Sequence, residues 1–222
     1  MKKRMIALAM ACTLTVGCAI GGTLAWLIDS TNSVTNTFTV GDINIDLKEH
    51  KYDAENGKLS ENETTCNNTY KFVPGDTLPK DPYVTVEKGS EDCYVFIKVE
   101  AANNQIVNGD DTVNNILDWT IDEKTDENSA GVWTKLNDVV DVYYTEVSSS
   151  TEDTTLNILK DQKVTVSSDV LKSMVSVINA QNTKPTLTFT AYAIQKDNLT
   201  DQNSDNVVNA ADAWALINPT NA

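Results

Sequence analysis

The sequence offers little material for acid–base or metal catalysis. Its only histidine is His50, whereas a catalytic zinc ion is generally held by three protein ligands, commonly His with Glu or Cys. A Ser or Cys nucleophile activated by histidine would also depend on His50. Since His50 stands beside Lys51 in a polar stretch, we expect it on a solvated loop. The sequence therefore predicts that this chain is not an enzyme.

A calcium site is the stronger candidate for chemistry near the C-terminus. The segment 201–212 places oxygen side chains at positions 1, 3, 5 and 12 of a twelve-residue loop, the spacing of a calcium-binding loop: Asp201, Asn203, Asp205 and Asp212. It resembles half of a dockerin, although Asn206 stands where glycine normally makes the turn and no second loop follows. The alternative is a polar loop that caps the last helix. No other cofactor is expected.

Four cysteines divide into two pairs by position. Cys12 and Cys18 lie within the first 25 residues, whereas Cys66 and Cys93 lie in the rest of the chain. In an oxidising compartment an even pair can form a disulfide. A Cys66–Cys93 bond is therefore one prediction, and two separate thiols are the other.

The N-terminus has the features of a secretory signal peptide, with Lys2, Lys3 and Arg4 followed by an uncharged run from Met5 to Ile28. Small residues place the cut after Ala25, so that the mature chain begins at Trp26. The alternatives are an uncleaved membrane anchor and lipidation at Cys18. Cleavage predicts a secreted protein that meets the membrane only transiently, through residues 1–25.

Charge excludes one class of partner. The formal net charge is −15, and it becomes −18 when the three basic residues of the signal are removed. A chain this acidic is not expected to bind nucleic acid or anionic lipid by electrostatic attraction.

Alternating apolar residues indicate strands with one buried face, and helical patterning is scarce. The expected strands are 38–47 (with a phase shift at Gly41-Asp42), 83–86, 93–99, 138–147, 163–167 and 186–195. Segment 93–99 is apolar on both faces. Helices are expected at 168–180 and 210–217, and polar loops at 52–68, 103–115 and 148–155. The prediction is a mainly β protein, a single jelly-roll-like β-sandwich over 37–222 with a few short helices and polar loop insertions.

Two motifs carry a resemblance to a known family. Gly22-Thr23-Leu24-Ala25-Trp26-Leu27-Ile28-Asp29 is followed by a strand containing Phe38-Thr39-Val40-Gly41, and Pro74-Gly75-Asp76-Thr77 precedes the strand at 84–86. Together they resemble the TasA/camelysin family of exported proteins of Gram-positive bacteria. The segments Thr190-Ala191-Tyr192-Ala193 and Ala211-Asp212-Ala213-Trp214 are similar to its clostridial branch.

The resemblance implies a structural subunit of an extracellular, biofilm-matrix or cell-surface fibre, exported with a SipW-type signal peptidase. Its partners would be other copies of the chain and related family subunits. In that family an N-terminal strand is donated to the next subunit, which assigns the donor to residues 26–36, with Trp26, Leu27, Ile28 and Val34 as its apolar residues. The alternative function is a monomeric cell-surface binding module that depends on calcium at the 201–212 loop.

Overall fold

The computed structural model describes residues 42–71, 73–108, 112–125, 130–170, 184–202 and 207–217. All of them belong to one compact unit, Gly41–Ala222. The unit is built from antiparallel sheets, with one α-helix and one 3-10 turn, η1 (Lys160–Gln162), in the described part of the chain.

The first sheet has the strand order β11-β4-β1-β2. Its central strands are β1 (Ile45–Asp53) and β4 (Tyr83–Val86), paired antiparallel from Ile45↔Val86 to Lys48↔Tyr83. The outer strands are β11 (Thr154–Asn157) beside β4 and β2 (Lys58–Thr65) beside β1. A bulge interrupts the β1–β2 pairing between His50 and Tyr52.

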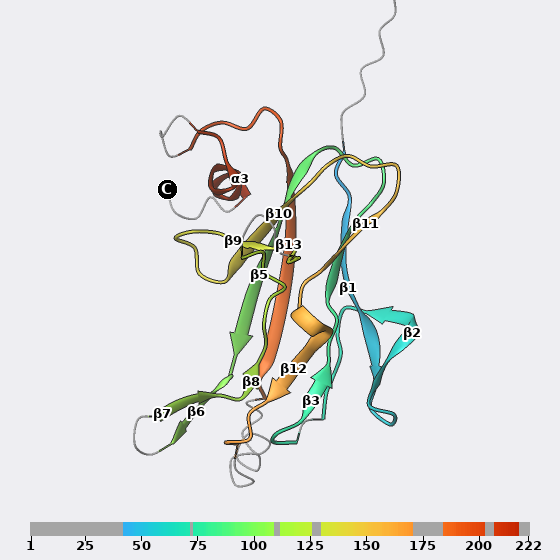
Figure 1. The fold of residues 1–222 in the computed structure, drawn as a ribbon, viewed down its shortest axis with the longest axis vertical. Helices are drawn as coiled ribbons and strands as arrows, with labels where there is room; N and C mark the ends of the chain where they lie inside the picture. Colours follow the sequence, from blue (N-terminus) through green and yellow to red (C-terminus); the bar gives the residue numbers. More distant parts are fainter. Residues whose placement is uncertain are drawn as a thin grey trace, which may run out of the picture. The chain divides into compact units, whose positions relative to one another are not determined.

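The second sheet has the order β13-β5-β10-β9. Its longest strands are β5 (Cys93–Ala102) and β13 (Thr186–Gln195), which pair over their whole length, and Figure 1 shows them side by side. On the other side of β5 lie β10 (Val142–Val147) and the short β9 (Thr134–Lys135).

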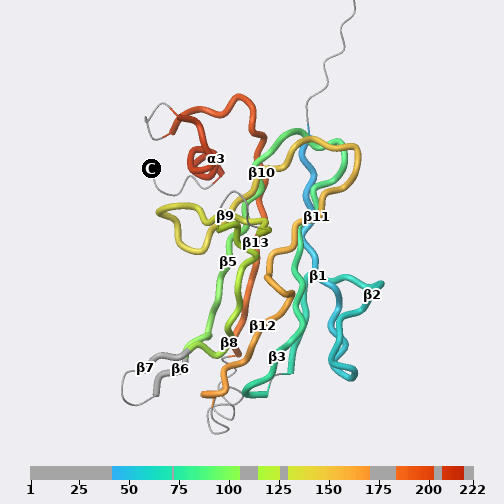
Figure 2. The backbone as a smooth tube through the Cα atoms, in the orientation of Figure 1, coloured from blue at the N-terminus to red at the C-terminus, as the bar shows by residue number. Residues whose placement is uncertain are grey.

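The remaining strands form two smaller sheets. A three-stranded sheet, β3-β12-β8, joins β3 (Thr77–Pro79), β12 (Lys163–Val166) and β8 (Leu117–Asp118). A separate hairpin consists of β6 (Gln105–Asn108) and β7 (Thr112–Asn115). The tube in Figure 2 traces the chain between these elements.

The main core lies between the two four-stranded sheets. One face of β4 and one face of β5 meet there. The buried residues come from both sheets, from the connections between them and from β12 of the three-stranded sheet: Val84, Val86, Leu156, Cys93, Val95, Ile97, Val99, Val147, Ile121, Trp133, Ile158, Leu159 and Val164. Alternate residues of a strand point to opposite faces, so this inward set follows from the period-two pattern. The prediction of a mainly β sandwich is confirmed.

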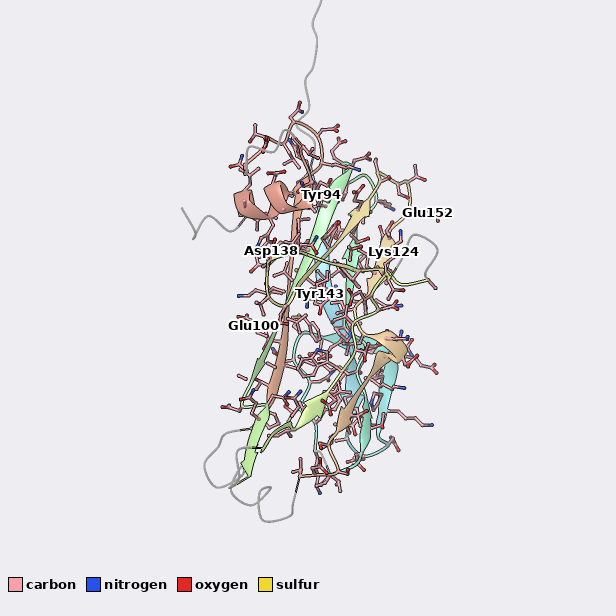
Figure 3. The ribbon with its side chains drawn as sticks, turned by 60° about the vertical axis from the view of Figure 1, so that its left-hand side comes forward. Tyr94, Glu100, Lys124, Asp138, Tyr143 and Glu152 are labelled. Atoms are coloured by element: carbon pink, nitrogen blue, oxygen red, sulfur yellow. The ribbon has the colours of Figure 1, made fainter. Side chains whose placement is uncertain are left out.

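A second cluster covers the outer face of the second sheet. The helix α3 (Ala210–Ile217) packs there, with Trp214 5.3 Å from Phe96 and 5.5 Å from Tyr192 between ring centroids. Figure 3 shows Tyr94 beside α3 and Glu100 further along β5. As predicted, β5 is buried on both faces, because the sandwich core takes one face and the α3 cluster takes the other.

Several sequence-based boundaries are confirmed. Strands β4 and β13 and the helix α3 have the predicted bounds, and β12 ends one residue earlier than predicted. The Pro74-Gly75 turn also forms, with Asp76 N donating to Val73 O at 3.0 Å and Gly75 at φ +86°. A positive φ at this position of a turn favours glycine.

Other predictions were wrong. The segment 52–68 is not a loop, since it contains the end of β1 and all of β2, and 103–115 contains the β6–β7 hairpin. Exposed strands of this kind are rich in polar residues on both faces, so composition alone resembles a loop. Residues 138–141 form a turn before β10 rather than part of the strand, and 154–157 form β11.

Some predictions fall outside the described residues: the signal peptide 1–25, the donor segment 26–36, the first part of strand 38–47 and most of helix 168–180. Within the described residues, no helix has the length and apolar character needed to cross a membrane.

Candidate functional site

The candidate site is one edge of the second sheet, where β13 has no further strand beside it among the described residues. Lys196, next to β13, donates its N–H to Asp92 O, next to β5, at 2.8 Å. Antiparallel pairs alternate between bonded and non-bonded residues, so even-numbered residues of β13 face β5. The backbone N–H and C=O groups of its odd-numbered residues therefore point away from β5, and the described residues supply no strand beyond β13.

This edge lacks the usual protection against pairing with another chain. Edge strands are commonly short, charged or interrupted by proline. In contrast, β13 has ten residues, no charge and no proline, with the sequence TLTFTAYAIQ. The edge strand β2 carries Lys58, Glu61 and Glu63, and the edge strands β9 and β11 have two and four residues. Strand β13 is thus the edge best suited to accept an added strand.

Two hollows adjoin the start of β13 and share the lining residues Asn67, Asn68, Lys80, Leu187 and Thr188. The first, of about 340 Å³, extends along residues 184–188 and is floored by Leu78, Leu117 and Val164. The second, of about 370 Å³, extends to Phe189 and is bounded by Leu47 and Cys66. We call the two hollows together the edge groove.

A buried ion pair forms part of the edge groove. Lys80 Nζ lies 2.6 Å from Glu49 Oε2, and the side chains are 13% and 8% exposed. The ammonium also lies over the rings of Tyr70, at 5.4 Å, and Phe189, at 6.0 Å. Burial, reinforced by the charge of Glu49, raises the pKa of Tyr70 well above its ordinary value. The pair joins β1 to the 79–82 segment, and removing one partner of a buried pair is strongly destabilising.

His50 and Asn68, which lines both hollows, form a hydrogen-bond network next to this pair in the sequence of β1. Asp81 Oδ1 accepts the backbone N–H of His50 at 3.0 Å, and Asp81 Oδ2 lies 2.6 Å from His50 Nδ1. At the β1 bulge Asn68 accepts from Tyr52 N and donates to His50 O, both at 2.8 Å. The prediction that His50 lies on a solvated loop is therefore wrong, because His50 lies in β1 and its side chain pairs with the buried carboxylate of Asp81.

Sequence reasoning missed both pairs. The β1–β4 register, which pairs Ile45 with Val86 and Lys48 with Tyr83, places His50 opposite Asp81 when it is continued past Pro82. The dipeptides Glu49-His50 and Lys80-Asp81 have complementary charges. This complementarity can be recognised only when the register of the two segments is known.

Cys66 and Cys93 are free thiols in the structure, which is the second of the two alternatives that the sequence left open. Cys93 is fully buried at the start of β5, whereas Cys66 is exposed and its thiol lies 3.9 Å from Leu47 O. Burial raises the pKa of Cys93 to about 11.

We expect a chain starting at Trp26 to react with a thiol reagent such as Ellman's reagent at one cysteine when folded and at two when unfolded. Because the pKa of Cys93 rises from 9.0 to about 11 on folding, its contribution to stability is present below pH 9 and is lost as pH rises toward 11. Urea unfolding at pH 8 and pH 10.5 should show this loss, and Cys93→Ala should reduce it. A folded protein with no reactive thiol would instead indicate the Cys66–Cys93 bond.

In the calcium candidate, Asp212 is 1% exposed and both of its carboxylate oxygens accept backbone N–H groups. Gln202 N donates at 2.7 Å and Asn209 N at 3.0 Å, while Asn209 Oδ1 accepts from Ala211 N at 2.7 Å. This is a reciprocal cap at the start of α3. Asn203 and Asp205 lie outside the described residues, and among those described no group of three or more His, Cys, Asp or Glu side chains is placed to hold a metal ion.

We expect Asp212→Ala to lower the free energy of unfolding by about 2 kcal/mol, because two buried N–H groups lose their acceptor. If capping is the whole role of this residue, EDTA and millimolar calcium leave the melting temperature of the unsubstituted protein unchanged. A calcium-dependent rise in melting temperature that disappears in Asp205→Ala would instead establish the calcium loop.

The remaining predicted site residues, Ala25, Trp26, Leu27, Ile28 and Val34, lie outside the described residues. Comparison with known proteins found no matching family, no matching characterised protein and no matching solved structure. The function must therefore be argued from the sequence and from the geometry of the edge.

Proposed function

We propose that the chain is an exported, non-enzymatic subunit of an extracellular-matrix or cell-surface fibre of a Gram-positive bacterium, and that it assembles by donating its N-terminal strand to the next copy. The observation that carries the proposal is the uncharged, ten-residue edge of β13, which has no neighbouring strand among the described residues. Such an edge is a template for pairing with another chain, and strand addition is an established mode of protein recognition.

The order of strands in the two layers supports the same function. The β1 strand of the first sheet packs against β13 of the second. The first sheet continues past β1 with one further strand, β2, whereas the second sheet ends at β13 among the described residues. A strand added beside β13 would occupy the position in the second sheet that β2 occupies beside β1 in the first.

The N-terminal segment has the composition that an added strand needs. Residues 26–40 contain one charged residue, Asp29, together with Thr, Val and aromatic residues that favour strands. The signal peptide and the resemblance to the TasA/camelysin family support export and fibre formation.

Electron microscopy and analytical ultracentrifugation of a chain starting at Trp26 test this function. We expect fibres at high protein concentration, and only monomers after deletion of residues 26–36. The deletion should leave the melting temperature nearly unchanged, because the compact unit begins at Gly41. Monodisperse particles from the complete chain, with and without calcium, would favour a surface binding module instead.

A further inference from the structure

The edge groove specifies which residues of the donor it accepts. We propose that it binds the N-terminal segment of a second copy of this chain, with Trp26 in the 340 Å³ hollow and Ile28 in the 370 Å³ hollow. This inference rests on the proposed fibre function, and it adds the acceptor, the direction of the donor and its register.

The spacing of the hollows matches the spacing of a strand. The first hollow is lined by β13 residues up to Thr188, and the second by Leu187 to Phe189, so they follow one another along β13. Residues i and i+2 of a strand point to the same face and lie roughly 6.6 Å apart. Trp26 and Ile28 therefore face one side together, while Leu27 faces the other.

The residues that line the hollows suit the side chains of Trp26 and Ile28. Leu78 and Val164, which floor the first hollow, are 8% and 3% exposed, and they offer an apolar base for an indole ring. Leu47 and Phe189 flank the second hollow and suit a branched aliphatic side chain.

The direction of the donor follows from the placement of Trp26 and Ile28. The segment 26–36 has eleven residues and β13 has ten. If Trp26 and Ile28 lie beside the start of β13, the rest of the donor can pair with β13 only by running parallel to it, toward Gln195. The odd-numbered backbone groups of β13 would then form the new ladder.

The same copy could in principle fill its own edge, but in a different register. Glu91 N donates to Asp42 O at 3.1 Å, which places the start of the described chain near the beginning of β5 and hence near Gln195. A segment running back from Asp42 along β13 brings roughly residue 34 to Leu187, since both strands advance about 3.3 Å per residue. If a second copy supplies the added strand, Ile28 lies beside Leu187. If the same copy supplies it, Val34 lies there.

The exposed thiol of Cys66 in the second hollow provides the probe. Single variants Ile28→Cys and Val34→Cys are made in the chain starting at Trp26, assembled under reducing conditions and then oxidised. We expect Ile28→Cys to give a ladder of disulfide-linked oligomers on a non-reducing gel, and Val34→Cys to give at least tenfold less. The added change Cys66→Ser should abolish the ladder.

Each other result overturns the assignment. A ladder from Val34→Cys contradicts the register, and an intramolecular bond from Val34→Cys shows self-occupation. Fibres that form with no cross-link in either variant keep the proposed function but place the acceptor elsewhere. Absence of fibres and of cross-links removes the proposed function, and the assignment with it.

Two substitutions without new thiols give an independent readout. Ala191→Pro removes an N–H from the open edge but no bond to β5, so it should block elongation while the monomer stays folded. Trp26→Ala should raise the concentration needed for assembly at least tenfold, while Leu27→Ala, on the opposite face, should change it little. Equal effects of Trp26→Ala and Leu27→Ala would contradict the assignment.

Discussion

Replacing Lys80 by methionine should lower the free energy of unfolding by about 3 kcal/mol, because it leaves the Glu49 carboxylate buried without its partner. The pair is 2.6 Å apart, and both side chains are largely buried. Methionine preserves most of the apolar stem, so the loss reports the charge and not a cavity. Chemical denaturation followed by circular dichroism measures the change.

Two control variants identify the cause. The double substitution Glu49→Gln and Lys80→Met removes both charges and should recover most of the loss. Lys51→Met breaks an exposed pair of similar length, 2.8 Å to Glu63, with side chains 60% and 63% exposed, and it should change stability little. If Lys80→Met were as stable as the unsubstituted protein, the pair would not hold β1 to the 79–82 segment.

Replacing Trp133 by alanine should lower the free energy of unfolding by about 4 kcal/mol. Trp133 is fully buried in the sandwich core, and its Nε1 donates to Asn157 O at 2.7 Å. The substitution removes a large apolar side chain and the donor to a strand carbonyl. A thermal or urea unfolding curve measures the loss.

The matched control is Trp119→Ala, since Trp119 packs against the same core but is only partly buried. Its loss should be clearly smaller. Equal losses would mean that burial does not distinguish the two residues. The burial of Trp133 also argues against a role as an exposed carbohydrate-binding platform, which is an alternative use of tryptophan on β proteins.

The sequence predicts best those elements whose pattern is set by burial. Strand β13 and the helix α3 have the predicted bounds, because each alternates or repeats apolar residues against a packed layer. Strand β2 was missed because it lies at an edge and its residues are mostly exposed, so no apolar period marks it. The hairpin β6–β7 was missed because its sequence is polar and rich in Asn, which is typical of a loop.

Of the two sides of the proposed site, only the donor segment could be predicted from the sequence. The signal junction and the alternation of Trp26 and Ile28 can be read from adjacent letters. The acceptor cannot, because it joins β13 to Asn67, Asn68 and Lys80, which are more than a hundred residues away in the sequence. The order of strands in a sheet decides which edge lacks a neighbour. The periodicity of a single strand does not reveal that order.

Competition by a synthetic peptide tests the central claim most directly. The peptide with the sequence of residues 26–36 is added in excess to the chain starting at Trp26, and fibre growth is followed by light scattering and electron microscopy. Strand donation predicts that the peptide stops elongation in proportion to its concentration, while a scrambled peptide of the same composition does not. Fibres that grow at the same rate with either peptide would contradict it.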